Sequence, residues 1–191
     1  MGKGTKGGAD VMGNQVVLGI DPSLTSSGFV VLRDTDMVER MAFQSKRSGV
    51  PRLLEIEQKA VDLINKYAPS MIAIETCFAG IRGGTAIALG ELSGILRTAI
   101  YRKGNGWIDV APAQVKKFAT GKGVADKDQM LMQVYKRWSI EFRTHDEADA
   151  YVLAQIARAV LDGTDGLTQF QKEVVADILA PKAKGKKAKA G

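Results

Sequence analysis

Hydrophobic residues occur in short runs along this chain, and several of these runs end at an acidic residue. Residues 16–20 are almost all apolar and precede Asp21, and the apolar residues 71–74 precede Glu75. Short apolar runs bounded by turn-forming residues are typical of buried strands, so we expect strands over 16–21 and 71–75. A third acidic group, at 146–149, opens a strongly apolar segment with helical spacing.

The rest of the pattern predicts a mixed α/β domain. Two further strands and a turn at 34–36 complete a three-stranded meander with the first strand. Apolar residues then recur with the helical period, interrupted by short strands. The expected elements after the first strand are strands at 28–32 and 37–43, a helix at 50–67, the strand at 71–75, a helix at 85–101, a strand at 107–110 and helices at 113–119, 125–138, 146–161 and 167–180.

Length and composition fit one domain of moderate size with tails at both ends. A single cysteine excludes an internal disulfide framework and a cysteine-rich zinc site, and it fits a reducing compartment. No apolar run approaches the roughly 20 residues of a membrane span, and the N-terminus lacks the apolar region of a secretory signal. The glycine-rich residues 1–14 and the lysine-rich residues 181–191 are expected to be disordered.

Positive charge is distributed unevenly. The formal net charge is +6, yet residues 181–191 alone hold five lysines and no acid. Within the domain, residues 82–143 carry eleven basic and five acidic groups, which makes this region a candidate nucleic-acid face. An ordinary solvated surface explains the same excess equally well. The lysine tail either adds salt-sensitive affinity for DNA or only aids solubility.

The acids that close the core elements are candidate metal ligands. A carboxylate at the end of a core strand costs on the order of several kcal/mol unless a partner offsets it, and a divalent cation is a common partner. Asp146 and Asp149 lie three residues apart, so one helical turn presents both to the same place. Each acid also has a structural explanation: Asp21 as a turn residue, Glu75 in a salt bridge, and Asp146 as a first-turn acid favoured by the helix dipole.

Four segments together resemble a known family. They are 18–23 (LGIDPS), 74–78 (IETCF), the basic stretch 112–127 and the motif 146–150 (DEADA). In order and spacing they are similar to the RuvC family of Holliday-junction resolvases, within the RNase H-like nuclease superfamily. The likeness covers roughly residues 16–161. It implies an α/β, RNase H-like fold with a mixed five-stranded sheet flanked by helices.

The resemblance also implies a domain layout and a reaction. Residues 1–14 would be a disordered tail, 15–162 the nuclease domain, 163–180 a peripheral helix and 181–191 a basic disordered tail. The activity would be metal-dependent, structure-selective cutting of four-way or other branched DNA in recombination and repair, by paired phosphodiester hydrolysis. The residues carried over as catalytic groups and as ligands of two Mg²⁺ ions, with Mn²⁺ able to substitute, are Asp21, Glu75, Asp146 and Asp149.

Partners follow from the same resemblance. Branched DNA would contact an aromatic residue at the junction centre and several basic residues, namely Phe78, Arg82, Lys116, Lys122 and Lys127. A homodimer is implied because two strands are cut symmetrically, and the small residues of the helix at 85–101 suit a dimer face. No membrane partner is expected, and the location would be the cytoplasm of a bacterial cell or a phage-infected host. His145 has two interpretations. It is a general base or a group that supports a metal ligand, or it is a surface residue that caps the helix.

Two alternatives come from other classes. A protein that binds branched DNA without cutting it would share the basic segment, although the presence of all four acids argues against it. An ATP-binding enzyme of the actin-like class would share the segment 19–25, which looks like that class's first phosphate loop. Such enzymes need two domains, and no second glycine-rich phosphate loop is present in the 191 residues.

Overall fold

One mixed sheet organises the chain in a computed structural model that describes residues 15–76 and 83–180. Within these residues the strand order is β3-β2-β1-β4-β5. Strands β2 and β3 run antiparallel to their neighbours, whereas β1, β4 and β5 are parallel to one another. The strands are β1 (Val16–Asp21), β2 (Ser27–Arg33), β3 (Asp36–Phe43), β4 (Met71–Glu75) and β5 (Trp107–Val110).

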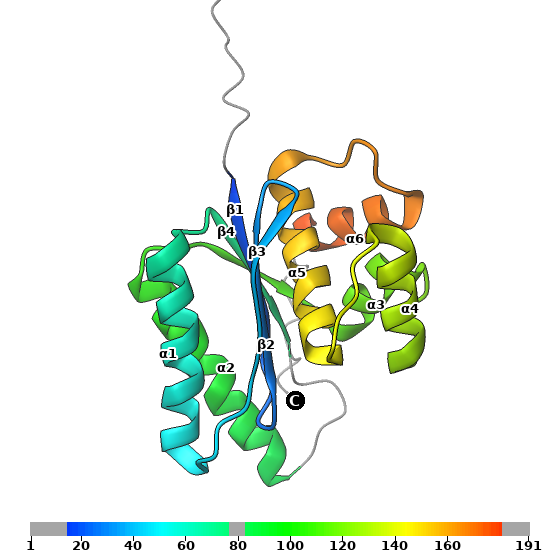
Figure 1. The fold of residues 1–191 in the computed structure, drawn as a ribbon. Coiled ribbons are helices and arrows are strands. Elements are labelled where there is room, and N and C mark those ends of the chain that lie inside the picture. The colour runs from blue at the N-terminus through cyan, green and yellow to red at the C-terminus, as the bar shows by residue number, and fades with distance from the viewer. Residues whose placement is uncertain (1–14, 77–82, 181–191) are drawn as a thin grey trace, which may run out of the picture.

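Helices cover both faces of the sheet. Figure 1 shows the sheet nearly edge-on, with α1 and α2 on one side and α3 to α6 on the other. The helices are α1 (Gly49–Tyr67), α2 (Gly84–Arg102), α3 (Pro112–Thr120), α4 (Lys127–Trp138), α5 (His145–Asp162) and α6 (Gln169–Leu179). The expected α/β fold with a mixed five-stranded sheet flanked by helices is therefore confirmed.

Side-chain alternation along the central strands divides the core into two layers. Leu18 and Ile74 pack with α1 and α2, whereas Val17 and Ala73 pack with α5. Successive residues of a strand point to opposite faces, so both layers are supplied by the same short strands. This is why β1 and β4 are continuously apolar instead of alternating with polar residues.

The expected elements are present, and their ends differ by one or two residues. Two helix starts shift by two residues: α4 begins at Lys127 instead of residue 125, and α6 at Gln169 instead of residue 167. In α4 the cause is a capping residue. Asp126 is its N-cap, and the carboxylate accepts a hydrogen bond from the Gln129 backbone N–H at 2.8 Å. A capping aspartate satisfies an amide that the first helical turn leaves without a partner, and this fixes where the helix starts.

Two glycines bring α5 unusually close to the sheet. A Cβ atom on Gly19 of β1 would lie 2.0 Å from the Ala150 carbonyl oxygen, and one on Gly28 of β2 would lie 2.0 Å from the Asp146 carbonyl oxygen. Both neighbours are helix backbone atoms, which do not yield as a flexible side chain does. Only glycine therefore fits at these two positions, and the N-terminal half of α5 rests directly on β1 and β2.

The last described helix is more integrated than a peripheral element. Val174 and Val175 of α6 are buried in the same core layer as α5. No helix among residues 15–76 and 83–180 is long and apolar enough to cross a membrane. The two predicted tails, 1–14 and 181–191, lie outside the described residues.

Candidate active site

Asp21 and Glu75 are brought side by side by the register of the two central strands. Ile20 pairs with Ile74 in the parallel β1–β4 ladder, so the next residues along each strand are Asp21 and Glu75. Alternation places both carboxylates on the α5 face, because Val17 and Ala73 point to that layer. Both acids are half-buried at the carboxyl end of the sheet.

The other two acids reach the same place from the first turns of α5. Thr144 caps this helix, and its hydroxyl accepts a hydrogen bond from the Glu147 backbone N–H at 3.2 Å. The contact of Gly28 with the Asp146 carbonyl oxygen sets this helix start directly over β2, one strand from Asp21. Asp146 and Asp149 follow within one turn, and both are half-buried.

The carboxylates act electrostatically on one another. Burial is the main reason that the pKa of Asp21 lies well above its ordinary value, and the charges of Glu75, Asp149 and Asp146 raise it further. Burial and the charge of Asp149 raise the pKa of Glu75 to about 7. Burial and the charge of Asp146 raise the pKa of Asp149 to about 6. Like charges in a poorly solvated place disfavour ionisation, so the four acids form one interacting cluster.

Two of the predicted DNA-contact lysines lie close enough to oppose this effect. The charge of Lys116 on α3 lowers the pKa of Glu75 and of Asp149. The charge of Lys127, at the start of α4, lowers the pKa of Asp21 and of Asp149. Both cations therefore border the acidic cluster.

Lys122 occupies the exposed loop between these two helices. It is not among the charges that shift the pKa of Asp21, Glu75 or Asp149. The Thr120 hydroxyl donates to the Lys116 carbonyl at 2.9 Å and accepts from the Lys122 backbone N–H at 3.1 Å. This hydroxyl holds the loop in place and leaves the Lys122 side chain in solvent. Phe78 and Arg82, the other expected contacts, lie outside the described residues.

A fifth acid near this end of the sheet faces the layer of α1 and α2. Asp109 of β5 pairs in register with Ile74, yet it accepts from the Arg97 guanidinium of α2 at 2.6 Å. His145 and Glu147 stand on either side of Asp146 in the sequence. Within residues 15–76 and 83–180, the buried atoms His145 Nδ1 and Glu147 Oε2 have no hydrogen-bond partner. The sequence pattern alone did not distinguish Asp109, His145 and Glu147 from the acids of the cluster.

The donor set suits a hard divalent cation. All four groups offer carboxylate oxygens, which Mg²⁺ prefers. The raised pKa values of Asp21, Glu75 and Asp149 show that a positive charge would relieve the repulsion among them. In the part of the chain that the structure describes, no three acidic, histidine or cysteine side chains already surround one point as metal ligands do. Drawing like charges to one point costs free energy that a cation offsets.

The fold and this cluster define a class. A mixed sheet in which two central parallel strands end in carboxylates, completed by acids of a helix lying across it, is the RNase H-like arrangement. The family model described as "Crossover junction endodeoxyribonuclease RuvC" matches residues 17–157. The chain therefore belongs to the RuvC family.

Individual relatives agree with this assignment. The chain is 34% identical over 147 residues to the RuvC of Rickettsia conorii, covering 73% of this chain and 94% of that protein. It is 33% identical over 148 residues to the RuvC of Rubrobacter xylanophilus, covering 73% and 83%. The solved structure of Thermus thermophilus RuvC is similar in fold, with a TM-score of 0.63 at 22% identity over 73% of this chain and 91% of that one.

Proposed function

We propose that this protein is a crossover junction endodeoxyribonuclease, which resolves Holliday junctions by cutting two strands in a paired reaction. Membership of the RuvC family supports the activity, and a Thermus thermophilus RuvC has been solved in complex with a Holliday junction substrate, at a TM-score of 0.64 and 23% identity over 73% of this chain and 90% of that one. The observation that carries the proposal is the convergence of Asp21, Glu75 and Asp149 in one interacting cluster.

The family is one of metal-dependent nucleases, and we assign two Mg²⁺ ions to each site, with Mn²⁺ as a substitute. Asp21, Glu75, Asp146 and Asp149 would hold them. Divalent ions supply an activated water and charge stabilisation for the leaving 3′ oxygen of a phosphodiester. Asp21 is the natural shared ligand, because its pKa responds to all three of the other acids.

The cations beside the cluster position the substrate. Lys116 and Lys127 border the carboxylates on the α3 and α4 side, where a phosphate bound between them would face Asp21 and Asp149. Lys122 extends this row into the exposed loop. We assign Phe78 to stacking at the junction centre and Arg82 to a further phosphate contact, on the strength of the family motif alone.

We also propose a homodimer formed through α2. Ile87 and Tyr101 on this helix leave 67% and 73% of their surfaces exposed, and small residues lie between them. A two-fold interface through α2 would present two acidic clusters to one branched substrate.

The nuclease domain spans residues 15–162, with 163–180 packed against it and tails at 1–14 and 181–191. DNA as the proposed substrate supports a location in the cytoplasm of a bacterium or a phage-infected host.

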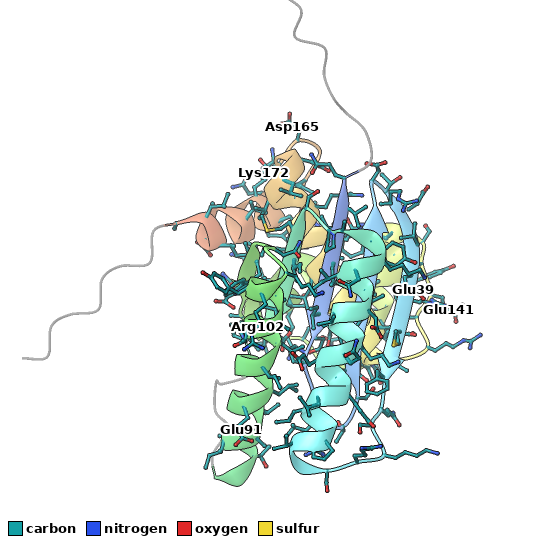
Figure 2. All side chains as sticks on the ribbon, turned by 90° about the vertical axis from the view of Figure 1, so that its left-hand side faces the viewer. Glu39, Glu91, Arg102, Glu141, Asp165 and Lys172 are labelled. Atoms are coloured by element: carbon teal, nitrogen blue, oxygen red, sulfur yellow. The ribbon has the colours of Figure 1, made fainter. Side chains whose placement is uncertain are left out.

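The decisive experiment compares cutting of four-way, three-way and linear duplex DNA with Mg²⁺. We expect wild type to cut the four-way junction fastest and Asp21→Asn to lose cutting by at least about 10³-fold, because one ligand of the reacting centre is removed. Asp165→Asn is the matched control, since this acid lies at the far end of the molecule (Figure 2). Equal cutting of all three substrates would reduce the protein to a general nuclease.

Binding without cutting is the outcome that favours the non-catalytic alternative. In that case wild type and Asp21→Asn would both bind the four-way junction and neither would produce nicked arms. Full cutting by Asp21→Asn would instead disprove the assignment of the acidic cluster as the metal site.

A further inference from the structure

A second charged surface lies at the same end of the sheet, between the end of β3 and the start of α1. It is a groove of about 540 Å³ whose lining includes Phe43, Lys46, Arg47, Glu55 and Lys59. We call it the basic groove. Its residues precede the region 82–143 in which the sequence concentrates positive charge, so composition did not reveal it.

The charges of the basic groove are arranged, not merely exposed. Glu55 is its single acid, and its two oxygens are taken up by Arg47 at 2.9 Å and the Ser45 hydroxyl at 2.5 Å. Lys59 lies over the Phe43 ring, 5.3 Å from its centroid. Lys46 and Lys59 form no ion pair with any other residue of 15–76 and 83–180. Two ammonium groups therefore remain available to an anion.

Strand register places this groove at the same end of the sheet as the acidic cluster, on the other face. Asp21 pairs with Gly28, and Gly28 pairs with Ala42, so these residues form one row across β1, β2 and β3. Phe43 comes next along β3 and packs in the layer of α1 and α2, whereas Asp21 lies on the α5 face. A duplex arm that leaves the acidic cluster would therefore pass over this end of the sheet to reach the basic groove.

A hydrogen bond ties the groove to the loop that follows Asp21. The Arg52 guanidinium, in the first turns of α1, donates to the Leu24 carbonyl oxygen at 3.1 Å. The Arg52 Nε atom is buried and has no hydrogen-bond partner among residues 15–76 and 83–180, so the base of this guanidinium lies inside the protein. The start of α1 and the β1–β2 loop are thereby held together, and the groove keeps a fixed position relative to Asp21.

We propose that the basic groove binds backbone phosphates of a duplex DNA arm that passes from the acidic cluster over the end of the sheet. The proposal rests on the proposed function, which supplies DNA as the ligand. Lys46 and Lys59 are its contacts, and neither takes part in the chemistry.

Salt dependence of binding tests the proposal. Affinity for a four-way junction is measured by titration at several salt concentrations in an Asp21→Asn background, which prevents cutting. Each lost phosphate contact makes the slope of log K against log salt shallower by about 0.9. We expect Lys46→Ala/Lys59→Ala to make the negative slope shallower by about 1 to 2 and to weaken binding at least about threefold. The charge-matched control is Arg33→Ala/Lys172→Ala. Arg33 is exposed and pairs with Val16, at the other end of β1 from Asp21. Lys172 lies at the opposite end of the molecule from Glu91 in the first half of α2 (Figure 2).

A neutral-linkage scan locates the contact. Single methylphosphonate linkages are placed along one arm, each removing one phosphate charge. Wild type should lose affinity at one or more linkages of that arm, and Lys46→Ala/Lys59→Ala should be insensitive to the same linkages, since the paired charge is already absent.

The outcomes separate this proposal from the proposed function. Equal slopes for the groove variant and its control, or unchanged sensitivity to every linkage, would overturn the groove while leaving junction cutting by wild type intact. Loss of cutting specificity with a preserved slope difference would overturn the proposed function instead. Absence of any DNA binding by wild type would overturn both.

Discussion

Asp21, Glu75 and Asp149 bind their protons more tightly in the folded protein than exposed carboxyl groups do. Their pKa values are raised, to about 7 for Glu75 and about 6 for Asp149, by burial first and neighbouring charges second. A group that binds its proton more tightly in the fold than in the unfolded chain stabilises the fold where it is protonated. Its contribution is lost as the pH rises through the folded-state pKa.

Stability without divalent cations should therefore decrease as the pH rises from about 5 to about 8. For Glu75 alone the shift corresponds to about 2–3 kcal/mol of unfolding free energy across this window. Urea unfolding in a chelator, followed by circular dichroism at each pH, measures the profile. Glu39 and Glu173 have lowered pKa values and act below about pH 4.5, outside this range.

The substitution Glu75→Gln should flatten this profile, because the amide does not titrate. Asp165→Asn should leave it unchanged. Adding Mg²⁺ should stabilise wild type more at pH 8 than at pH 5, because cations compete with protons for the carboxylates. A profile for wild type in chelator that is flat or rising between pH 5 and 8 would contradict the proposed setting of the cluster.

At the scale of elements, the contact of α5 with the two glycines decides where Asp146 lies. The substitution Gly28→Ala forces a Cβ against the Asp146 carbonyl oxygen, so the helix start must move. We expect a loss of about 1–3 kcal/mol in unfolding free energy and a fall in cutting of about 10²-fold or more, since displacement by about 1 Å is enough to disrupt a catalytic geometry. Thermal unfolding and junction cleavage measure the two effects.

Gly106→Ala is the matched control for this prediction. A Cβ on Gly106, which lies outside α2 just before β5, would meet nothing within 4 Å, so stability and cutting should stay close to wild type. Normal cutting and stability in Gly28→Ala would show that α5 can shift without moving Asp146 out of the cluster.

The elements themselves were largely predictable, whereas their contacts were not. The apolar runs ending at Asp21 and Glu75 identified both strands, because continuous burial leaves a strong pattern. The close approach of α5 is possible because Gly19 and Gly28 have no side chain. The hydrophobic pattern of the sequence does not show where a missing side chain allows such an approach. The site residues came from family motifs; their adjacency required the β1–β4 register. The basic groove combines residues from β3 and α1 and had no local signal.

At the scale of the whole molecule, dimerisation through α2 can be tested at Gly94, where alanine is the better helix former and should stabilise the single chain by about 0.5–1 kcal/mol. An added Cβ at position 94 meets nothing in the single chain, so any clash in Gly94→Ala must come from a second copy. If α2 is the interface, we expect the dimer of Gly94→Ala to dissociate at least about tenfold more readily than wild type, although the monomer is more stable. Light scattering during size-exclusion chromatography across a dilution series measures this.

Paired cutting gives a second readout of the dimer. A weakened dimer should release junctions nicked on one strand, which a supercoiled cruciform plasmid reports as open circles instead of linear molecules. Unchanged dimer affinity for both Gly94→Ala and Ile87→Asp, the latter placing a charge on an exposed apolar position, would exclude α2 as the interface.

Asp21 stands near the beginning of the chain, whereas Asp146 and Asp149 stand in one of its last helices. The central strands and both of their acids are translated long before α5 leaves the ribosome. If the four carboxylates act as proposed, a growing chain carries only two of them at this point and could not yet cut the genome beside it. Competence to cut would arise late, when α5 packs against Gly19 and Gly28 and adds Asp146 and Asp149.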